Sequence, residues 1–271
     1  MSAAPSTVGE GMGIHPTAIV HPDAVLGENV TIGPYAIVGE NVTIGDDCVL
    51  AARAVLEKNV RLGRGVKVGI GSVLGGDPQD LKFRGEETWV EIGDGTVIRE
   101  YTTVNRGTTQ SFKTTVGRNC LLMSYVHLGH DCHFGDHVIV SNASQFAGHV
   151  TVEDRVIVSG LCAFHQFVRV GRHAFIGGMT RVAKDTPPFL RASGNPMKLY
   201  GLNTIGLQRS GFDDETMHEL KRAYRLLFRS ELPLTAALER GREELNLSVE
   251  QVRQMLEFVE GSVREGRGVG F

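Results

Sequence analysis

The chain has 271 residues, of which 41% are hydrophobic and 22% are charged, and its net charge of −3 argues against a general nucleic-acid binder. No apolar run approaches the roughly 18 residues that span a membrane, so no stable membrane insertion is expected. Residues 1–13 have neither a basic start nor an apolar stretch, and we expect a loose terminus and a cytoplasmic location.

Between Ile14 and Val182 a large apolar residue recurs at every sixth position, with two interruptions. The pattern runs from Ile14 to Leu74, returns in phase at Ile92, and resumes in phase at Val116, which makes 26 hexads. Neither the helical period of 3.6 nor the strand period of 2 explains a strict period of six. A parallel β-helix explains it, because short strands and turns alternate and equivalent residues stack. We therefore predict a β-helix over residues 14–186.

The residue four positions after each large apolar one is small in every hexad but one, which has Pro78. This spacing resembles the hexapeptide repeat of left-handed β-helix proteins, in which three hexads form one triangular coil. The handedness rests on that resemblance. All four cysteines occupy the small position and are predicted to be core thiols in a reducing compartment; they are Cys48, Cys120, Cys132 and Cys162.

Two segments interrupt the repeat without changing its phase, and we expect residues 75–91 and 105–115 to be loops. After the repeat, residues 187–271 are predicted to form a helical domain of three helices. Asp213 or Asp214 caps the first, the second runs from about 233 to 245, and a capping box starts the third, which ends before Gly261.

Six of the ten histidines lie between His127 and His165. Inside the repeat, Leu128 and Cys132 point inward, so we expect the polar residues between and beside them to lie at or near the outer surface: His127, His130, Asp131 and His133. Residues 18 apart should stack on successive coils, which predicts Asp131 beneath His149 and His127 beneath Gln145. A histidine beside a carboxylate is suited to general-base catalysis. Three histidines on facing coils are equally suited to zinc, and outer histidines are also ordinary solvated residues. The remaining ones, His15, His21, His137 and His173, we assign to structural or surface roles.

Several short stretches together resemble the UDP-N-acetylglucosamine O-acyltransferase family, which opens lipid A synthesis. The likeness runs from about residue 14 to the end of the chain and includes both loops and the helical tail. Its most specific parts are 79–83 (QDLKF), 129–132 (GHDC), 147–150 (AGHV) and 165–167 (HQF). Further matches are 90–93 (VEIG), 98–100 (IRE), 106–108 (RGT), 177–178 (GG), 187–188 (PP), 194–195 (GN) and 211–212 (GF).

The resemblance implies direct transfer of an (R)-3-hydroxyacyl group from acyl carrier protein to the 3-hydroxyl of UDP-N-acetylglucosamine. In this scheme His130 is the general base, Asp131 supports the imidazolium, and the backbone N–H of Gly148 stabilises the oxyanion. No cofactor and no metal are implied, since the phosphopantetheine thioester of the carrier is itself a substrate. The family is trimeric, with the active cleft between neighbouring prisms, so a homotrimer is expected.

The substrate contacts that the resemblance implies include two cations suited to a diphosphate, Lys82 and Arg209, which are otherwise ordinary solvated charges. The complete set is Gln79, Asp80, Lys82, His127, His149, His165, Gln166, Asn203 and Arg209. Gly178 matches the site that limits acyl-chain depth, and a glycine there favours a longer chain. Ile205 and Ser210 depart from the family pattern, where a glutamate and a second arginine are common.

Four basic residues of the first predicted helix, Lys221, Arg222, Arg225 and Arg229, are candidates for docking the acidic carrier protein, or form a solvated face. Four other functions are open: an N-acyltransferase of lipid A assembly, an acetyl-CoA-dependent hexapeptide acetyltransferase, a γ-type carbonic anhydrase with three-histidine zinc, and a non-catalytic assembly subunit. A 3-amino analogue of the nucleotide sugar is an alternative acceptor.

Overall fold

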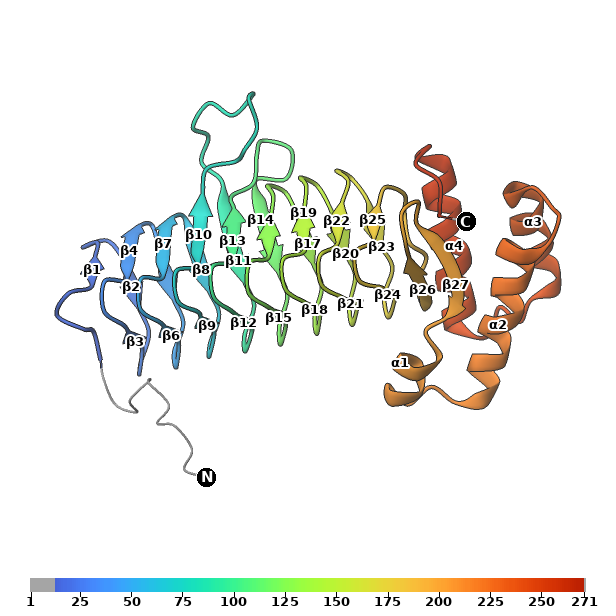
Figure 1. Cartoon of the computed structure of the whole chain (residues 1–271), viewed down its shortest axis with the longest axis horizontal. Coiled ribbons are helices and arrows are strands. Elements are labelled where there is room, and N and C mark those ends of the chain that lie inside the picture. Colours follow the sequence, from blue (N-terminus) through green and yellow to red (C-terminus); the bar gives the residue numbers. More distant parts are fainter. Residues whose placement is uncertain (1–12, 271) are drawn as a thin grey trace. The chain divides into compact units, whose positions relative to one another are not determined.

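The computed structural model describes residues 13–270, which divide into two compact units at residues 137 and 138. Of the predicted loose terminus, all but Gly13 lies outside the described residues. Each unit is built from coils of short parallel strands, and the predicted left-handed parallel β-helix with C-terminal helices is confirmed (Figure 1). Among the described residues, no helix is long and apolar enough to cross a membrane.

In the first unit the strands form three parallel sheets whose partners lie 18 residues apart where no loop intervenes, as in the pair Ile19 and Ile37. One sheet contains β1 (Ile19–Val20), β4 (Ile37–Glu40), β7 (Val55–Lys58), β10 (Val73–Gly76), β13 (Thr103–Asn105) and β16 (His127–Leu128). The second contains β2 (Val25–Leu26), β5 (Thr43–Ile44), β8 (Val60–Leu62), β11 (Trp89–Ile92), β14 (Lys113–Val116) and β17 (His133–Phe134). The third contains β3 (Thr31–Ile32), β6 (Val49–Leu50), β9 (Lys67–Val68), β12 (Val97–Ile98) and β15 (Leu121–Leu122).

The core of this unit is the predicted apolar column. Ile32, Leu50 and Leu122 are at most 1% exposed, and the small residues four positions further along are buried as well. At most corners the chain turns through a residue in the left-handed region, such as Asn29, with a φ of 55°, and Asp47, with a φ of 59°. Asn and Asp tolerate this region better than most other side chains, which explains their recurrence at the turns.

Two loops leave the first unit on the same side (Figure 1). Strand β10 reaches Gly76 and β11 begins at Trp89, so the first protruding segment is 77–88. Strand β13 reaches Asn105 and β14 begins at Lys113, so the second is 106–112. The strands thus extend further into both predicted loops than the break in the repeat suggests.

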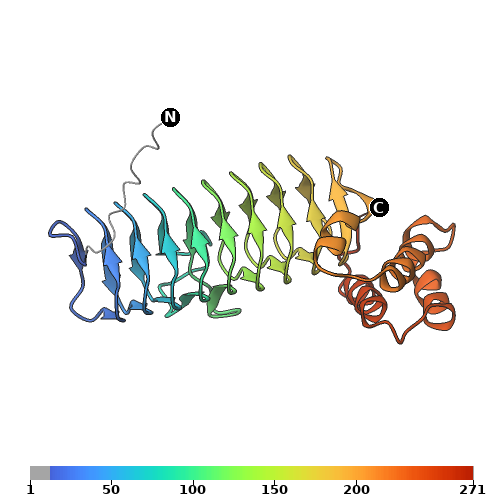
Figure 2. The same cartoon turned by 90° about the horizontal axis from the view of Figure 1, so that it is seen from below.

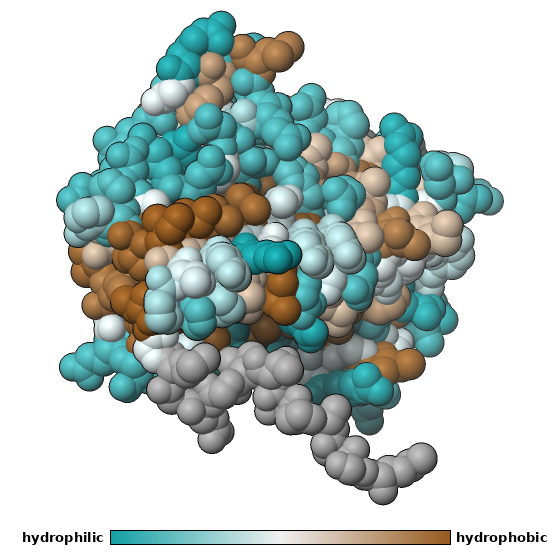
Figure 3. All heavy atoms as spheres, turned by 60° about the vertical axis from the view of Figure 1, so that its left-hand side comes forward, coloured by the Kyte–Doolittle hydropathy of each residue, from teal (hydrophilic) through white to brown (hydrophobic). Residues whose placement is uncertain are grey.

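The first coil carries exposed apolar side chains for two reasons. Ile14, the first residue of the inward column, is 51% exposed because no described coil precedes it. Ile19 and Val25 are 63% and 60% exposed because each lies one residue before a column residue and therefore faces outward. Figure 3 shows apolar surface on this end of the unit. By contrast, Ile32 and Ile44, further along the same column, are at most 1% exposed.

The second unit continues with the same strand geometry and then departs from it. One sheet contains β18 (Ile139–Val140), β21 (Ile157–Val158), β24 (Phe175–Ile176), β26 (Leu190–Ser193) and β27 (Lys198–Leu202). The other two contain β19 (Gln145–Phe146), β22 (Ala163–Phe164) and β25 (Arg181–Val182), and β20 (Thr151–Val152) and β23 (Arg169–Val170). Strand β26 pairs in parallel with β24, whereas β27 pairs with β26 in the antiparallel direction. This reversal was not predicted.

Four helices follow, one more than predicted: α1 (Thr204–Arg209), α2 (Asp214–Arg229), α3 (Leu234–Glu244) and α4 (Glu250–Arg264). Helices α2, α3 and α4 pack together (Figure 2). The cap predicted at Asp213 is confirmed, since its carboxylate accepts from the N–H of Thr216, and the predicted second helix corresponds to α3.

The prediction for the last helix was wrong at both ends. Val249 is the N-cap without a side-chain bond, because the hydroxyl of Ser248 donates to Asn246 instead of capping the helix. The helix continues through Gly261, which is buried and whose added Cβ would lie 3.2 Å from a guanidinium nitrogen of Arg169. This glycine therefore permits close packing and does not end the helix.

All four cysteines are buried, at most 2% exposed, as predicted for core thiols. The tail after α4 returns to the end of the repeat. Asp185 forms a parallel bridge with Val269, and its N–H donates to the carbonyl of Gly268. Both Asp185 and Val269 are fully buried, so this return covers the last coil of the second unit.

Candidate functional site

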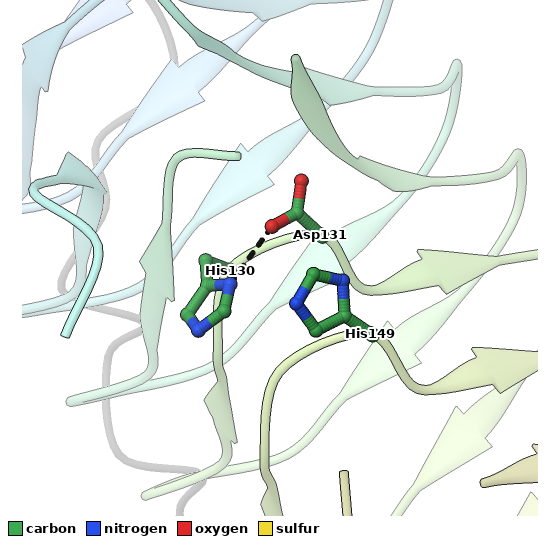
Figure 4. A group of neighbouring side chains, drawn as sticks. All are labelled: His130, Asp131 and His149. Atoms are coloured by element: carbon green, nitrogen blue, oxygen red, sulfur yellow. Dashed lines mark hydrogen bonds and ion pairs between the residues drawn. The ribbon is translucent and has the colours of Figure 1, made fainter. Parts of the chain in front are cut away.

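The most distinctive polar group of the first unit is the pair His130 and Asp131, in the turn between β16 and β17. The Nδ1 of His130 lies 2.8 Å from Oδ2 of Asp131, and Figure 4 shows the ring turned toward the carboxylate. The side chain of Asp131 is 0% exposed and that of His130 is 14% exposed. Asp131 was expected at or near the outer surface, and its side chain is instead fully buried.

Asp131 is buried because the loop 106–112 folds over it. The N–H of Thr108 donates to Oδ1 over 2.9 Å, and its hydroxyl donates to Oδ2 over 2.7 Å. The hydroxyl of Ser111 lies 2.5 Å from Oδ1. Thr108 and Ser111 were not among the predicted site residues. The available signal was the run of hydroxyl side chains in a loop that interrupts the repeat without shifting it.

The environment of Asp131 keeps it ionised. Burial alone would raise the pKa of the carboxyl group, but hydrogen bonds from His130, Ser111 and Thr108 outweigh that effect and hold its pKa below the ordinary value. An ionised carboxylate accepts the proton on Nδ1 of His130, so Nε2 carries the lone pair of the neutral ring. This tautomer is the one that a general base requires.

Two neighbouring histidines face hydroxyl groups. The Nδ1 of His127 lies 2.7 Å from the hydroxyl of Thr103, and that of His133 lies 3.0 Å from the hydroxyl of Thr115. Burial lowers the pKa of both rings; for His133 the attraction of Asp131 partly offsets this effect. Both histidines are therefore neutral near pH 7 and available as hydrogen-bonding groups.

The loop 77–88 carries Gln79, Asp80 and Lys82. The carboxylate of Asp80 accepts from the N–H of Lys82 over 2.9 Å, which forms a tight local turn. Gln79 and Lys82 are exposed, and Leu81 between them is 97% exposed. The loop's base is held by an ion pair between Asp77 and the buried guanidinium of Arg106. The side chains at its tip are accordingly presented to solvent.

In the second unit, Gly148 and His149 form a turn, and Gln166 and Phe167, 18 residues further along, form the equivalent turn of the next coil, directly after His165. The ring of His149 stacks on Phe167 at 4.3 Å with parallel planes, which shows the 18-residue step directly. The N–H of Phe167 donates to the carbonyl of Gly148 over 3.1 Å. The Nδ1 of His165 lies 3.1 Å from the carbonyl oxygen of Gln166.

Asn203, Ile205 and Arg209 line a cavity of about 430 Å³ together with Arg191, Ile157 and Phe175. Asn203 is 7% exposed, and its amide donates to the carbonyl of His173 and accepts from the N–H of Gly206. Asn203 therefore caps α1 and shapes the cavity, while the two arginines supply its positive charge. Arg191 was not predicted, because it lies in the unpredicted hairpin.

Gly178 is exposed, and an added Cβ would lie 3.5 Å from the carbonyl oxygen of Gly160. A side chain at this position therefore fits without a collision. The glycine is thus not required by packing, and its lack of a side chain leaves space on the surface.

The basic residues of α2 divide between two environments. Lys221, Arg225 and Arg229 line a hollow of about 760 Å³, whose wall also includes Tyr224 and Met217. Arg229 is held there by its bonds to the Tyr224 hydroxyl, 2.7 Å away, and to the carbonyl of Leu199. Arg222 instead pairs with Glu219 at 2.9 Å. The predicted cluster of four cations is therefore a cluster of three.

His130 and Asp131 are ligand types that zinc accepts. Both oxygens of Asp131 already accept hydrogen bonds from Thr108, Ser111 or His130. Coordination by Asp131 would therefore displace donors that the fold supplies. This chemistry fits an imidazole-supporting carboxylate better than a metal ligand.

Comparison with known proteins agrees with this chemistry. A family model described as UDP-N-acetylglucosamine O-acyltransferase, domain 2, matches residues 185–269, and a bacterial transferase hexapeptide model matches residues 23–58. An acyl-[acyl-carrier-protein]–UDP-N-acetylglucosamine O-acyltransferase of Myxococcus xanthus is 50% identical, covering 93% of this chain and 97% of the relative. A protein of the same name from Anaeromyxobacter is 43% identical over 93% of this chain and 98% of the relative.

Among solved structures, the UDP-N-acetylglucosamine acyltransferase of Bacteroides fragilis superimposes with a TM-score of 0.91 at 40% identity, covering 94% of this chain and 98% of the other. The chain therefore belongs to the acyl-[acyl-carrier-protein]–UDP-N-acetylglucosamine O-acyltransferase family and is an acyltransferase.

Proposed function

We propose that the enzyme transfers an (R)-3-hydroxyacyl group from acyl carrier protein to the 3-hydroxyl of UDP-N-acetylglucosamine, with His130 as the general base. The observation that carries this mechanism is the bond between His130 Nδ1 and the buried, ionised carboxylate of Asp131. The carboxylate orients the ring and stabilises the imidazolium that forms in the reaction.

In the proposed reaction Nε2 of His130 takes the proton of the sugar hydroxyl as the oxygen attacks the thioester carbonyl. A C–O bond forms, and the carbonyl becomes a tetrahedral oxyanion. The intermediate then collapses, the C–S bond breaks, and the departing thiolate takes the proton back from the imidazolium. The atoms balance without an acyl-enzyme, so the scheme needs neither a cysteine nor a serine nucleophile.

The backbone N–H of Gly148 is the proposed oxyanion donor. The 18-residue step of the repeat supports this pairing, because it leads from His130 to Gly148 and from Asp131 to His149 along the sequence. The proposed sugar and nucleotide contacts come from the loop 77–88, from β16, from turns of the second unit and from α1 with its cap. They are Gln79, Asp80, Lys82, His127, His149, His165, Gln166, Asn203 and Arg209. Gly178 is the proposed limit on acyl-chain depth.

The carrier protein is proposed to dock at the hollow of α2. Carrier proteins are acidic, and Lys221, Arg225 and Arg229 give this hollow a cationic wall. A homotrimer in the cytoplasm is the proposed state of the enzyme. Measurement of the mass in solution tests the trimer, which requires about three times the chain mass of 29.4 kDa.

The decisive experiment is an assay of acyl transfer from 3-hydroxyacyl carrier proteins of several chain lengths to UDP-N-acetylglucosamine. We expect acylated nucleotide sugar from the wild type and at least a hundredfold loss of kcat in His130→Ala. His137→Ala, at an exposed turn, is the matched control and should stay active.

Three results would contradict parts of the proposal. Full activity of His130→Ala would exclude this residue as the base. Product formed only with the 3-amino acceptor would change the substrate. No product with any donor, together with stoichiometric zinc in the purified protein, would favour the carbonic anhydrase alternative.

A further inference from the structure

The carboxylate of Asp131 receives more donors than an imidazole partner requires. Its Oδ1 accepts from the N–H of Thr108 at 2.9 Å and from the hydroxyl of Ser111 at 2.5 Å, with the N–H of Ser111 at 3.3 Å. Its Oδ2 accepts from the hydroxyl of Thr108 at 2.7 Å and faces His130 Nδ1 at 2.8 Å. An ionised carboxylate has about four lone-pair sites, so this one is saturated.

The loop that supplies these donors is fixed at both ends. The N–H of Phe112 donates to the carbonyl of Thr108 over 2.7 Å, and the N–H of Trp89 donates to the carbonyl of Phe112 over 2.9 Å. An added Cβ on Gly107 would collide with the backbone of Lys113, so this close approach requires glycine. The hydroxyls are therefore held in place before any substrate binds.

Ion pairs also hold the C-terminal end of this loop, at the start of β14. Glu91 accepts from Lys113 at 2.9 Å and from Arg61 at 3.2 Å, and the guanidinium of Arg61 lies over the ring of Trp89. Ser111 also lies 2.9 Å from the carbonyl of Lys113, but its one proton can serve a single acceptor. The shorter distance and the negative charge of the carboxylate favour donation to Asp131.

We propose that Thr108 and Ser111 are positioning residues that act through Asp131, holding the plane of its carboxylate and setting how strongly it supports the imidazolium of His130. This inference rests on the proposed function of His130 as the base. Each hydroxyl that donates to Asp131 draws negative charge away from the bond to Nδ1. The loop thereby limits how much of the carboxylate's negative charge faces the imidazole.

The test compares Thr108→Val, which keeps the shape and the N–H bond but removes the hydroxyl, with Ser111→Ala and with the conservative Thr108→Ser. Outer partners of metal-bound histidines typically contribute about 10- to 100-fold, and we take the same range for the donors to Asp131. We expect Thr108→Val and Ser111→Ala each to lower kcat by about that factor while KM for both substrates stays within about twofold. Thr108→Ser should restore most of kcat, because it returns the donor.

The pH profile separates positioning from simple structural support. With a donor removed, Asp131 carries more charge toward His130, so the acidic limb of kcat/KM should move to higher pH in Thr108→Val and Ser111→Ala and return in Thr108→Ser. Thr109→Val, an exposed neighbour in the same loop, is the matched control and should leave kcat and the profile unchanged. Thermal unfolding establishes whether each variant is folded. If Thr108→Val does not fold, the test relies on Ser111→Ala, which changes a half-buried position.

The inference is overturned if both variants keep wild-type kcat, or if kcat falls with an unmoved pH profile and no recovery in Thr108→Ser. Its failure is distinguishable from failure of the proposed function. An active wild type with an inactive His130→Ala and unaffected loop variants would reject only the role of the loop. A wild type without transfer activity would reject the proposed function itself.

Discussion

His173 makes the stability of the second unit sensitive to acid. Its ring packs in a triangle with those of Phe189 and Phe212, with ring centroids 6.0 Å and 5.1 Å away. Burial, followed by repulsion from Arg155 and Arg172, lowers its pKa to about 4, and the attraction of Asp154 does not offset this. The folded protein therefore holds this histidine neutral at pH values where an unfolded chain protonates it.

The magnitude follows from the two pKa values. Above pH 6.5, the ordinary histidine value, both states hold a neutral ring and the residue contributes no penalty. As the pH falls toward 4, the unfolded chain binds the proton first, so stability is progressively lost. At pH 5 the difference amounts to roughly 2 kcal/mol, and screening by solvent around this half-buried ring reduces it to about 1 kcal/mol.

The perturbation is His173→Asn, because asparagine tolerates the φ of 56° at this turn and does not titrate. The free energy of unfolding is measured by denaturant titration at pH 7 and at pH 5. Between these two pH values, it should fall by about 1 kcal/mol more in the wild type than in the variant. His137→Asn, at an exposed turn with a φ of 59°, is the matched control and should keep the wild-type loss. Equal losses in the wild type and His173→Asn would refute the reasoning.

Three further predictions concern docking, chain length and the core. The double variant Lys221→Glu, Arg225→Glu should raise the KM for carrier protein about tenfold at low salt and leave the KM for the nucleotide sugar unchanged. The control Lys67→Glu, on β9, should change neither KM. Gly178→Leu should fold, since a Cβ there meets nothing closer than 3.5 Å, and should shift the preferred donor to a shorter acyl chain in a competition assay. Phe146→Ala removes a fully buried ring that stacks on the next coil at 4.1 Å, and should lower the free energy of unfolding by about 3–5 kcal/mol in urea titrations.

The repeat was predictable because its physics is local. A period of six places one large and one small side chain on the same inward column in every hexad, and no long-range information is needed to see it. The buried cysteines follow from the same phase. The cap at Asp213 was also predictable, since an acidic residue before an amphipathic stretch has a direct role at a helix start.

The features that were missed depend on contacts between distant segments. Asp131 is buried by the return of a loop about twenty residues earlier in the chain, and nothing in its own hexad indicates that cover. Helix α1 has six residues, too few for a helical period to stand out. Glycine often ends a helix, but Gly261 packs tightly against Arg169 and lies inside α4. The glycine in the left-handed region is Gly266, with a φ of 72°, which follows the helix.

Of the predicted site, the pair His130 and Asp131 is the part that the geometry supports most directly. The role of Arg191 beside Arg209 could not be anticipated, because a cavity lined from a hairpin and a short helix has no signature in either segment alone. The separate environment of Arg222 could not be anticipated either. Its guanidinium donates to Glu219 one turn away and to the carbonyl of Glu244 in α3, instead of lining the hollow with the other basic residues.

The reversal of direction at β26 and β27 also determines where the growth of the coil stops. Every coil presents strand edges with the same backbone polarity as the edges it covers, so a further coil of hexads could always be added. The antiparallel strand ends this series by offering an edge of the opposite polarity. The number of coils and the strand that ends them are therefore specified by different segments, the hexads of residues 14–186 and the antiparallel pair β26 and β27.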